Sequence, residues 1–172
     1  MKLVSPSKEF ESAFKVYYQD FLEQDIDNSD YYKDGVLDFS RYIECLNDEA
    51  RGVNLPDGYV PCNHYWLVND EGEILGAIRV RHRIDNEFLS LEAGHIGYDI
   101  APSKRGSGYG KAMLKFAIPK ASSLGIKQAL ITADEDNIAS RKVIEANGGK
   151  FEKIVFGKVC LGPVARYWLN CQ

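Results

Sequence analysis

The sequence is short of the features that mark several large classes of protein. It has four cysteines, none in a CxxC pair, and three histidines. No apolar run has the about 20 residues that a membrane-spanning helix needs. The first ten residues, MKLVSPSKEF, turn polar after three, unlike a secretory signal peptide. The cysteines are therefore expected to be free cytoplasmic thiols. They share no metal-ligand spacing with the histidines, so no metal is expected.

An excess of positive charge is also missing. Lysine and arginine total 21 against 25 aspartate and glutamate residues, and no dense basic run occurs. Nucleic-acid-binding proteins usually carry a basic face, so we expect no nucleic-acid partner. Hydrophobic residues make up 45% of the 172 residues, enough for a real core. This length favours a single domain over residues 1–172.

Apolar periodicity and turn residues predict an α/β fold, with helices packed on a mixed sheet. A helix is expected to begin at Ser5-Pro6, with Ser5 as N-cap. The acidic segment 23–38 is predicted to be a loop. Strands are predicted at 2–4, 65–68, 74–82, 92–100, 127–133, 151–156 and 165–170, and further helices at 39–50, 109–124 and 137–146. No internal repeat or interdomain linker interrupts this order.

The most informative stretch is a glycine-rich turn, IAPSKRGSGYG, between the strand that ends at Ile100 and the following helix. Glycines allow tight turns that direct successive N–H groups to one place, and a helix N-terminus adds partial positive charge. Together they can bind a pyrophosphate, with Arg105 at the rim as an additional cation. The spacing of Gly106, Gly108 and Gly110 differs from the dinucleotide fingerprint, and Ala112 breaks the P-loop pattern. The alternative is a glycine turn without a ligand.

RGSGYG, from Arg105 to Gly110, resembles the Q/R-x-x-G-x-G/A signature of the GNAT N-acetyltransferase superfamily. The strand end YDIAP before it and the segment NIAS at 137–140, followed by Asn147-Gly148, resemble further family segments. The longer stretch HIGYDIAPSKRGSGYG is similar to a group of bacterial predicted acetyltransferases. The resemblance runs from about Tyr65 to the C-terminus. It implies a mixed, mostly antiparallel sheet of about seven strands flanked by about four helices.

The resemblance also implies a reaction and a binding site for acetyl-CoA, the co-substrate. An acetyl group would pass to a primary amine by direct attack in a ternary complex. The amine would belong to a small molecule or a peptide. The expected CoA-binding groups are the backbone of Tyr98 and Ile100 along the pantetheine arm, the side chain of Asn137, nearby Ser140, and the backbone N–H groups of Arg105, Gly106, Ser107, Gly108, Tyr109 and Gly110 for the pyrophosphate. Asn137 can equally be a plain helix N-cap.

The catalytic residues depart from the family's pattern. Where many members carry a carboxylate or histidine on the fourth predicted strand, this chain has Gly94. Glu92 lies one pleat further along the same face and could act as general base through a water. His95 is adjacent but faces the other way. The alternative for Glu92 is an exposed charge at the start of the strand, and the alternative for His95 is a packed or exposed ring. The family's tyrosine acid is replaced by Ile144, which leaves solvent or Tyr167 to protonate the thiolate.

The acceptor cannot be named from these residues. The acidic segment 23–38 is a candidate for attracting a cationic amine, or it is simply a solvated loop. Because Gly94 and Ile144 replace the usual groups, a catalytically silent CoA-binding module on the same fold stays an alternative. An acyl group longer than acetyl and a homodimer are also left open. No membrane partner is expected.

Overall fold

Seven strands form one sheet in the order β1-β2-β3-β4-β5-β7-β6 in the computed structural model, which describes residues 1–172. Every neighbouring pair is antiparallel except β4 and β5, which run parallel. This confirms the mixed, mostly antiparallel sheet. The strands are β1 Lys2–Val4, β2 Cys62–Val68, β3 Ile74–Arg81, β4 Ile96–Ile100, β5 Gln128–Asp134, β6 Lys150–Phe156 and β7 Pro163–Asn170.

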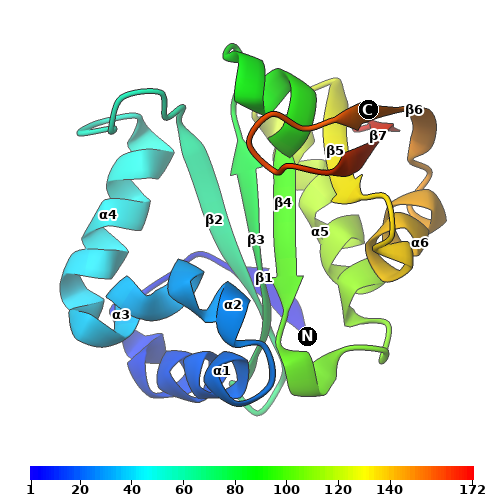
Figure 1. The fold of residues 1–172 in the computed structure, drawn as a ribbon. Helices are drawn as coiled ribbons and strands as arrows, with labels where there is room; N and C mark the ends of the chain where they lie inside the picture. Colours follow the sequence, from blue (N-terminus) through cyan, green and yellow to red (C-terminus); the bar gives the residue numbers. More distant parts are fainter.

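Helices cover both faces of this sheet (Figure 1). One face carries α5 and α6, and the N-terminal helices α1 to α4 lie against β2, β3 and β4 on the other. The helices are α1 Glu11–Gln24, α2 Ile26–Ser29, α3 Lys33–Leu37, α4 Phe39–Arg51, α5 Tyr109–Ser123 and α6 Ile138–Ala146. Shorter turns are η1 Lys8–Phe10, η2 Asp30–Tyr32, the π-helical η3 Leu89–Ala93 and η4 Pro102–Lys104. None of these helices combines the length and apolar character required to cross a bilayer.

Two apolar clusters hold the layers together. Between the sheet and α5 and α6, the fully buried residues include Leu67, Val80 and Met113. On the opposite face an aromatic cluster joins α1, η2 and α4 to β2. Its buried aromatic members are Phe14, Tyr17, Phe21, Tyr32, Phe39 and Trp66. Where β2 and β3 are covered on both faces, at residues 65–68 and 74–78, their sequences are apolar and every residue is buried.

The N-terminal part differs from the sequence-based prediction. The first long helix begins at Glu11, after η1, and Ser5 does not cap it. The predicted acidic loop 23–38 is largely helical, as α2, η2 and α3. Tyr32, only 3% exposed, packs against the aromatic rings of α1 and fixes this segment. Such long-range packing overrides a local preference for loop.

The predicted strand 92–100 is also wrong in its first part. Residues Leu89–Ala93 form the π-helical turn η3, and β4 begins only at Ile96. Gly94 separates the two, with φ of 65° and ψ of −170°, a conformation that is essentially restricted to glycine. A Cβ atom there would lie 2.4 Å from the carbonyl oxygen of Leu130 on β5. Glu92 therefore does not share a strand face with Tyr98.

Candidate functional site

The parallel strands β4 and β5 are paired at a single position, Ile96 with Ile131. Beyond this point β4 forms strand hydrogen bonds only with β3, and it does so through its odd-numbered residues. The N–H of Ala101, for example, donates to the Leu75 carbonyl of β3 at 3.0 Å. The N–H groups of Tyr98 and Ile100 consequently point toward β5, where no strand bonds them. An unpaired strand edge inside a sheet can accept an extended ligand chain.

The glycine-rich turn lies at the end of this edge, where β4 leads into α5. The first helical bond of α5 runs from the Ala112 N–H to the Gly108 carbonyl at 3.2 Å, and no N–H from Gly106 through Lys111 has an acceptor in the protein. Gly106 and Gly108 have φ values of 77° and 81°. The N–H of Arg105 donates to the Pro102 carbonyl of its own turn at 3.2 Å, so the series of unpaired N–H groups begins one residue later than the predicted set.

The side chain of Arg105 does not point into this turn as the predicted extra cation. Its guanidinium pairs with the carboxylate of Asp25 and donates to the Ile100 carbonyl at 3.2 Å. Nearby, Asp20 of α1 accepts both the N–H of Ser103, at 3.0 Å, and its hydroxyl, at 2.9 Å. Two acidic residues of the N-terminal helices thus hold the turn in place. Asp25 belongs to the acidic segment that was expected to attract the acceptor.

The N-terminus of α6 lies across the gap from β4. The side chain of Asn137 accepts the N–H of Ser140 at 3.0 Å, so it is the N-cap of α6. Its amide N–H groups donate to no protein atom and stay available to a ligand. The Tyr98 hydroxyl lies 2.8 Å from the Ser140 hydroxyl and 3.2 Å from its carbonyl oxygen. Burial raises the pKa of Tyr98 to about 12, so this hydroxyl stays protonated at neutral pH.

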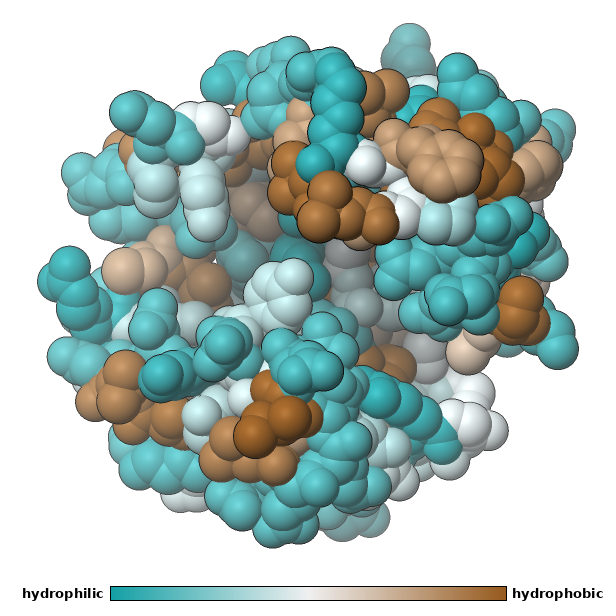
Figure 2. Space-filling view, in the orientation of Figure 1, coloured by the Kyte–Doolittle hydropathy of each residue, from teal (hydrophilic) through white to brown (hydrophobic).

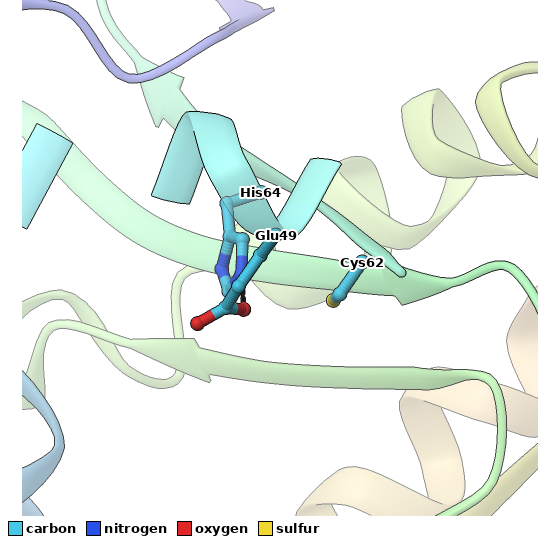
Figure 3. Close-up of side chains that lie close together, drawn as sticks. All are labelled: Glu49, Cys62 and His64. Atoms are coloured by element: carbon cyan, nitrogen blue, oxygen red, sulfur yellow. Dashed lines mark hydrogen bonds and ion pairs between the residues drawn. The ribbon is translucent and has the colours of Figure 1, made fainter. Parts of the chain in front are cut away.

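A second polar group, not foreseen from the sequence, lies on the face of the sheet that carries α1 to α4 (Figure 3). His64 Nε2 lies 2.7 Å from a carboxylate oxygen of Glu49 on α4. With Cys62, two residues before His64 on the same side of β2, they bring three potential metal-ligand atoms within 4.8 Å of one another. The alternation of β2 is the signal that could have found the pair. Burial opposes protonation of His64, but its thiol and carboxylate neighbours outweigh it and raise the pKa to about 9.

A family model described as the acetyltransferase (GNAT) domain matches residues 40–150, well over half of the chain. The chain belongs to the GNAT acetyltransferase family. It is accordingly an N-acetyltransferase by family. No curated protein matches its sequence.

Solved structures agree with this GNAT assignment at the level of fold. RimJ from Mycobacterium smegmatis, in complex with CoA-disulfide, has a TM-score of 0.71 and 16% identity, over 98% of this chain and 80% of that one. The microcin self-immunity acetyltransferase MccE, in complex with acetyl-CoA and AMP, has a TM-score of 0.67 and 15% identity, over 98% of this chain and 91% of that one. A spermidine N-acetyltransferase SpeG chimera from Vibrio cholerae has a TM-score of 0.64 and 12% identity, over 99% of this chain and 96% of that one.

Glu92, one of the two predicted bases of this GNAT protein, is committed to a structural contact. Glu92 is 5% exposed as a residue, and its carboxylate accepts the N–H groups of Lys158, Val159 and Cys160 at distances from 2.7 to 3.3 Å. These backbone hydrogen bonds, that of Cys160 foremost, lower the pKa of Glu92. A carboxylate of lowered pKa that already accepts several hydrogen bonds is a weak proton acceptor.

His95, the other predicted base, bonds to β5. Its Nδ1 accepts the Leu130 N–H at 3.0 Å, and its own backbone N–H donates to the Leu130 carbonyl at 2.7 Å. Burial, reinforced by Arg81, lowers the pKa of His95, so the ring is neutral and carries its proton on Nε2. With its lone pair engaged, the ring can donate a hydrogen bond but cannot take a proton without leaving β5.

The replacement acid, Tyr167, lies on β7 with no exposed surface. Its hydroxyl accepts from Arg141 at 2.8 Å and donates to Glu145 at 2.9 Å, both on α6. Ile144, in the family's tyrosine position, is fully buried in the larger core. Both side chains therefore serve the packing of α6 on the sheet.

Proposed function

We propose that residues 1–172 act as one domain that transfers the acetyl group of acetyl-CoA to a primary amine by direct attack in a ternary complex. One observation supports this most. The run of unpaired N–H groups from Gly106 to Lys111 lies at the end of the unpaired edge of β4. A pyrophosphate bound to these N–H groups would place an attached extended arm along the edge of β4.

The predicted CoA-binding residues take the following roles in this proposal. The N–H groups from Gly106 through Gly110 bind the pyrophosphate, while Arg105 holds the turn against Asp25. Tyr98 and Ile100 bond the pantetheine arm through their backbone. Asn137 offers its free amide N–H groups to the same arm, and Ser140 fixes the Tyr98 side chain beside it.

The transfer itself requires a polarised carbonyl and a neutral amine. The N–H of Tyr98, directed into the gap, is placed to donate to the oxyanion that forms on the thioester. An alkylamine has a pKa of about 10.4 in water and must lose a proton before it attacks. Given their contacts, Glu92 and His95 position the backbone around Gly94, and the amine's proton passes to solvent. Solvent also protonates the thiolate, since Tyr167 is engaged with α6.

The acceptor would reach the thioester from the face that carries α1 to α4, because α5 and α6 cover the other face. Figure 2 shows that the molecule is hollowed on this side, above the middle of the sheet, with many hydrophilic residues around the hollow. Such a site suits the amine of a small molecule or of a peptide. A cytoplasmic location and a homodimer remain predictions.

Isothermal titration with acetyl-CoA and CoA, followed by initial rates with a panel of amines, tests the proposal. We expect binding of both nucleotides and intersecting double-reciprocal plots. Parallel plots, or a burst of free CoA without acceptor, would contradict direct attack. Binding without turnover on any amine would favour the silent CoA-binding module, and preferred turnover of a longer acyl-CoA would correct the acyl group.

A further inference from the structure

Six residues of three neighbouring strands lie on the face of the sheet that carries α1 to α4, on the acceptor side, and are here called the floor. They are Cys62 and His64 on β2, Arg79 and Arg81 on β3, and Gly97 and Asp99 on β4. Strand alternation puts them on the face of Trp66, Ala77 and Ala101, which belong to the aromatic cluster. Most of this floor is charged, although the same face of the sheet also carries the aromatic cluster.

Two of the three cations on the floor have a carboxylate partner. His64 pairs with Glu49 at 2.7 Å, and Arg79 pairs with Asp99 at 3.2 Å. The guanidinium of Arg79 also lies under the ring of Tyr31, at 5.3 Å from its centroid. Each of these positive charges is balanced within the protein.

Arg81 has no such partner. Only its Nη1 makes hydrogen bonds, to the carbonyl oxygens of Gly94 at 3.1 Å and Ala93 at 3.5 Å, and no carboxylate forms an ion pair with it. The Nε and Nη2 donors, which form one edge of the guanidinium, have no acceptor in the protein. The side chain is partly buried, and burial lowers its pKa. A partly desolvated guanidinium with one free edge has the geometry that binds two oxygens of one anion.

We infer that this acetyltransferase takes acceptors that carry a carboxylate or phosphate near the amine, and that Arg81 binds this anionic group. The inference rests on the proposed function, since it specifies the acceptor of the same site. Arg81 bonds to the carbonyl of Gly94, next to the start of β4, so an anion on its free edge lies beside the strand that holds the thioester. It also opposes the expectation that the acidic segment selects a cationic amine.

Matched pairs of acceptors test the inference through the ratio of their kcat/KM values. Glycine with glycinamide, and β-alanine with β-alaninamide, differ in the carboxylate. Phosphoethanolamine with ethanolamine differs in the phosphate, and the two sets distinguish the sources of the anion. We expect at least one anionic member to be preferred about 30-fold or more, and Arg81→Met to abolish that preference by slowing only the anionic member. Arg81→Lys keeps the positive charge but lacks the two-donor edge of the guanidinium, so it should retain part of the preference for the anionic acceptor.

Arg83→Met is the matched control, because Arg83 is exposed and pairs with Asp85 just beyond β3. It should leave the ratio unchanged. Melting temperature and acetyl-CoA affinity show whether Arg81→Met has only damaged η3. Such damage would lower kcat/KM equally for both members of a pair. Equal rates for every pair in the unaltered protein would overturn the inference and leave the acetyltransferase proposal standing.

A second measurement needs no turnover. N-acetylglycine and N-acetylglycinamide are titrated into the CoA-bound protein and its Arg81→Met variant. Selective binding of the acid that depends on Arg81 supports the anion site even if no amine is acetylated, in which case only the proposed function fails. Equal binding of the two, or no binding of either, overturns the anion site.

Discussion

Two glycines at opposite ends of α5 allow the phosphate-binding role of the turn to be separated from its backbone strain. Gly108 precedes the helix and Gly125 follows it, and both have φ of 81°. An added Cβ would meet no heavy atom within 4 Å at either position. Each of the variants Gly108→Ala and Gly125→Ala should therefore lose about 1–2 kcal/mol of folding free energy, the penalty of a left-handed conformation. Urea unfolding should show the same loss of stability in both.

The affinity for acetyl-CoA should differ between the two variants. Gly108→Ala places a methyl group beside the unpaired N–H series, whereas Gly125→Ala is a full helix length away. A hydrogen bond to a charged group is worth about 1.5–3 kcal/mol, so losing one weakens binding about 10- to 100-fold. Isothermal titration measures this, with Gly125→Ala expected to match the unaltered protein. Unchanged affinity in Gly108→Ala would show that the turn binds no pyrophosphate.

Two further substitutions probe the break before β4. Gly94→Ala should lower the free energy of unfolding in urea by about 3 kcal/mol or more, because backbone strain adds to a clash with the Leu130 carbonyl. Gly125→Ala should lower it less, and equal losses in the two variants would refute the close approach. The stability that Glu92 adds is complete above its unfolded pKa near 4.5 and is lost as the pH falls through its lowered folded pKa. Glu92→Gln should therefore be less stable at pH 7 and lose less stability in acid; identical pH profiles would show that the carboxylate is not held by the loop after β6.

Local patterns were sufficient for much of the fold. The hairpin of β2 and β3, the glycine turn before α5 and the Asn cap of α6 depend on residues close in sequence, and all occur where predicted. The predicted CoA-binding residues follow from the same local patterns, and the structure brings them to one unpaired strand edge and the turn and helix start beside it.

The wrong sequence-based predictions share a physical cause, which is contact between segments far apart in the chain. The local sequence predicts Arg105 as a free cation at a phosphate-binding turn, but its side chain bonds to Asp25, 80 residues earlier. The local sequence favours Glu92 as an exposed charge at a strand start, but its carboxylate oxygens accept N–H groups 66 to 68 residues later. Neither partner can be chosen from spacing, because many acidic residues and loop amides were equally available.

Gly94 joins these observations into one constraint on catalysis. Its backbone conformation is open only to glycine, and the space a side chain would need is filled by the Leu130 carbonyl. No carboxylate or histidine can therefore occupy the family's usual base position in this chain without moving β5. The two flanking candidates are drawn away from the gap, Glu92 to the loop after β6 and His95 to β5. Because neither flanking residue is free to take a proton, the conformation of Gly94 supports the proposal that the amine's proton passes to solvent.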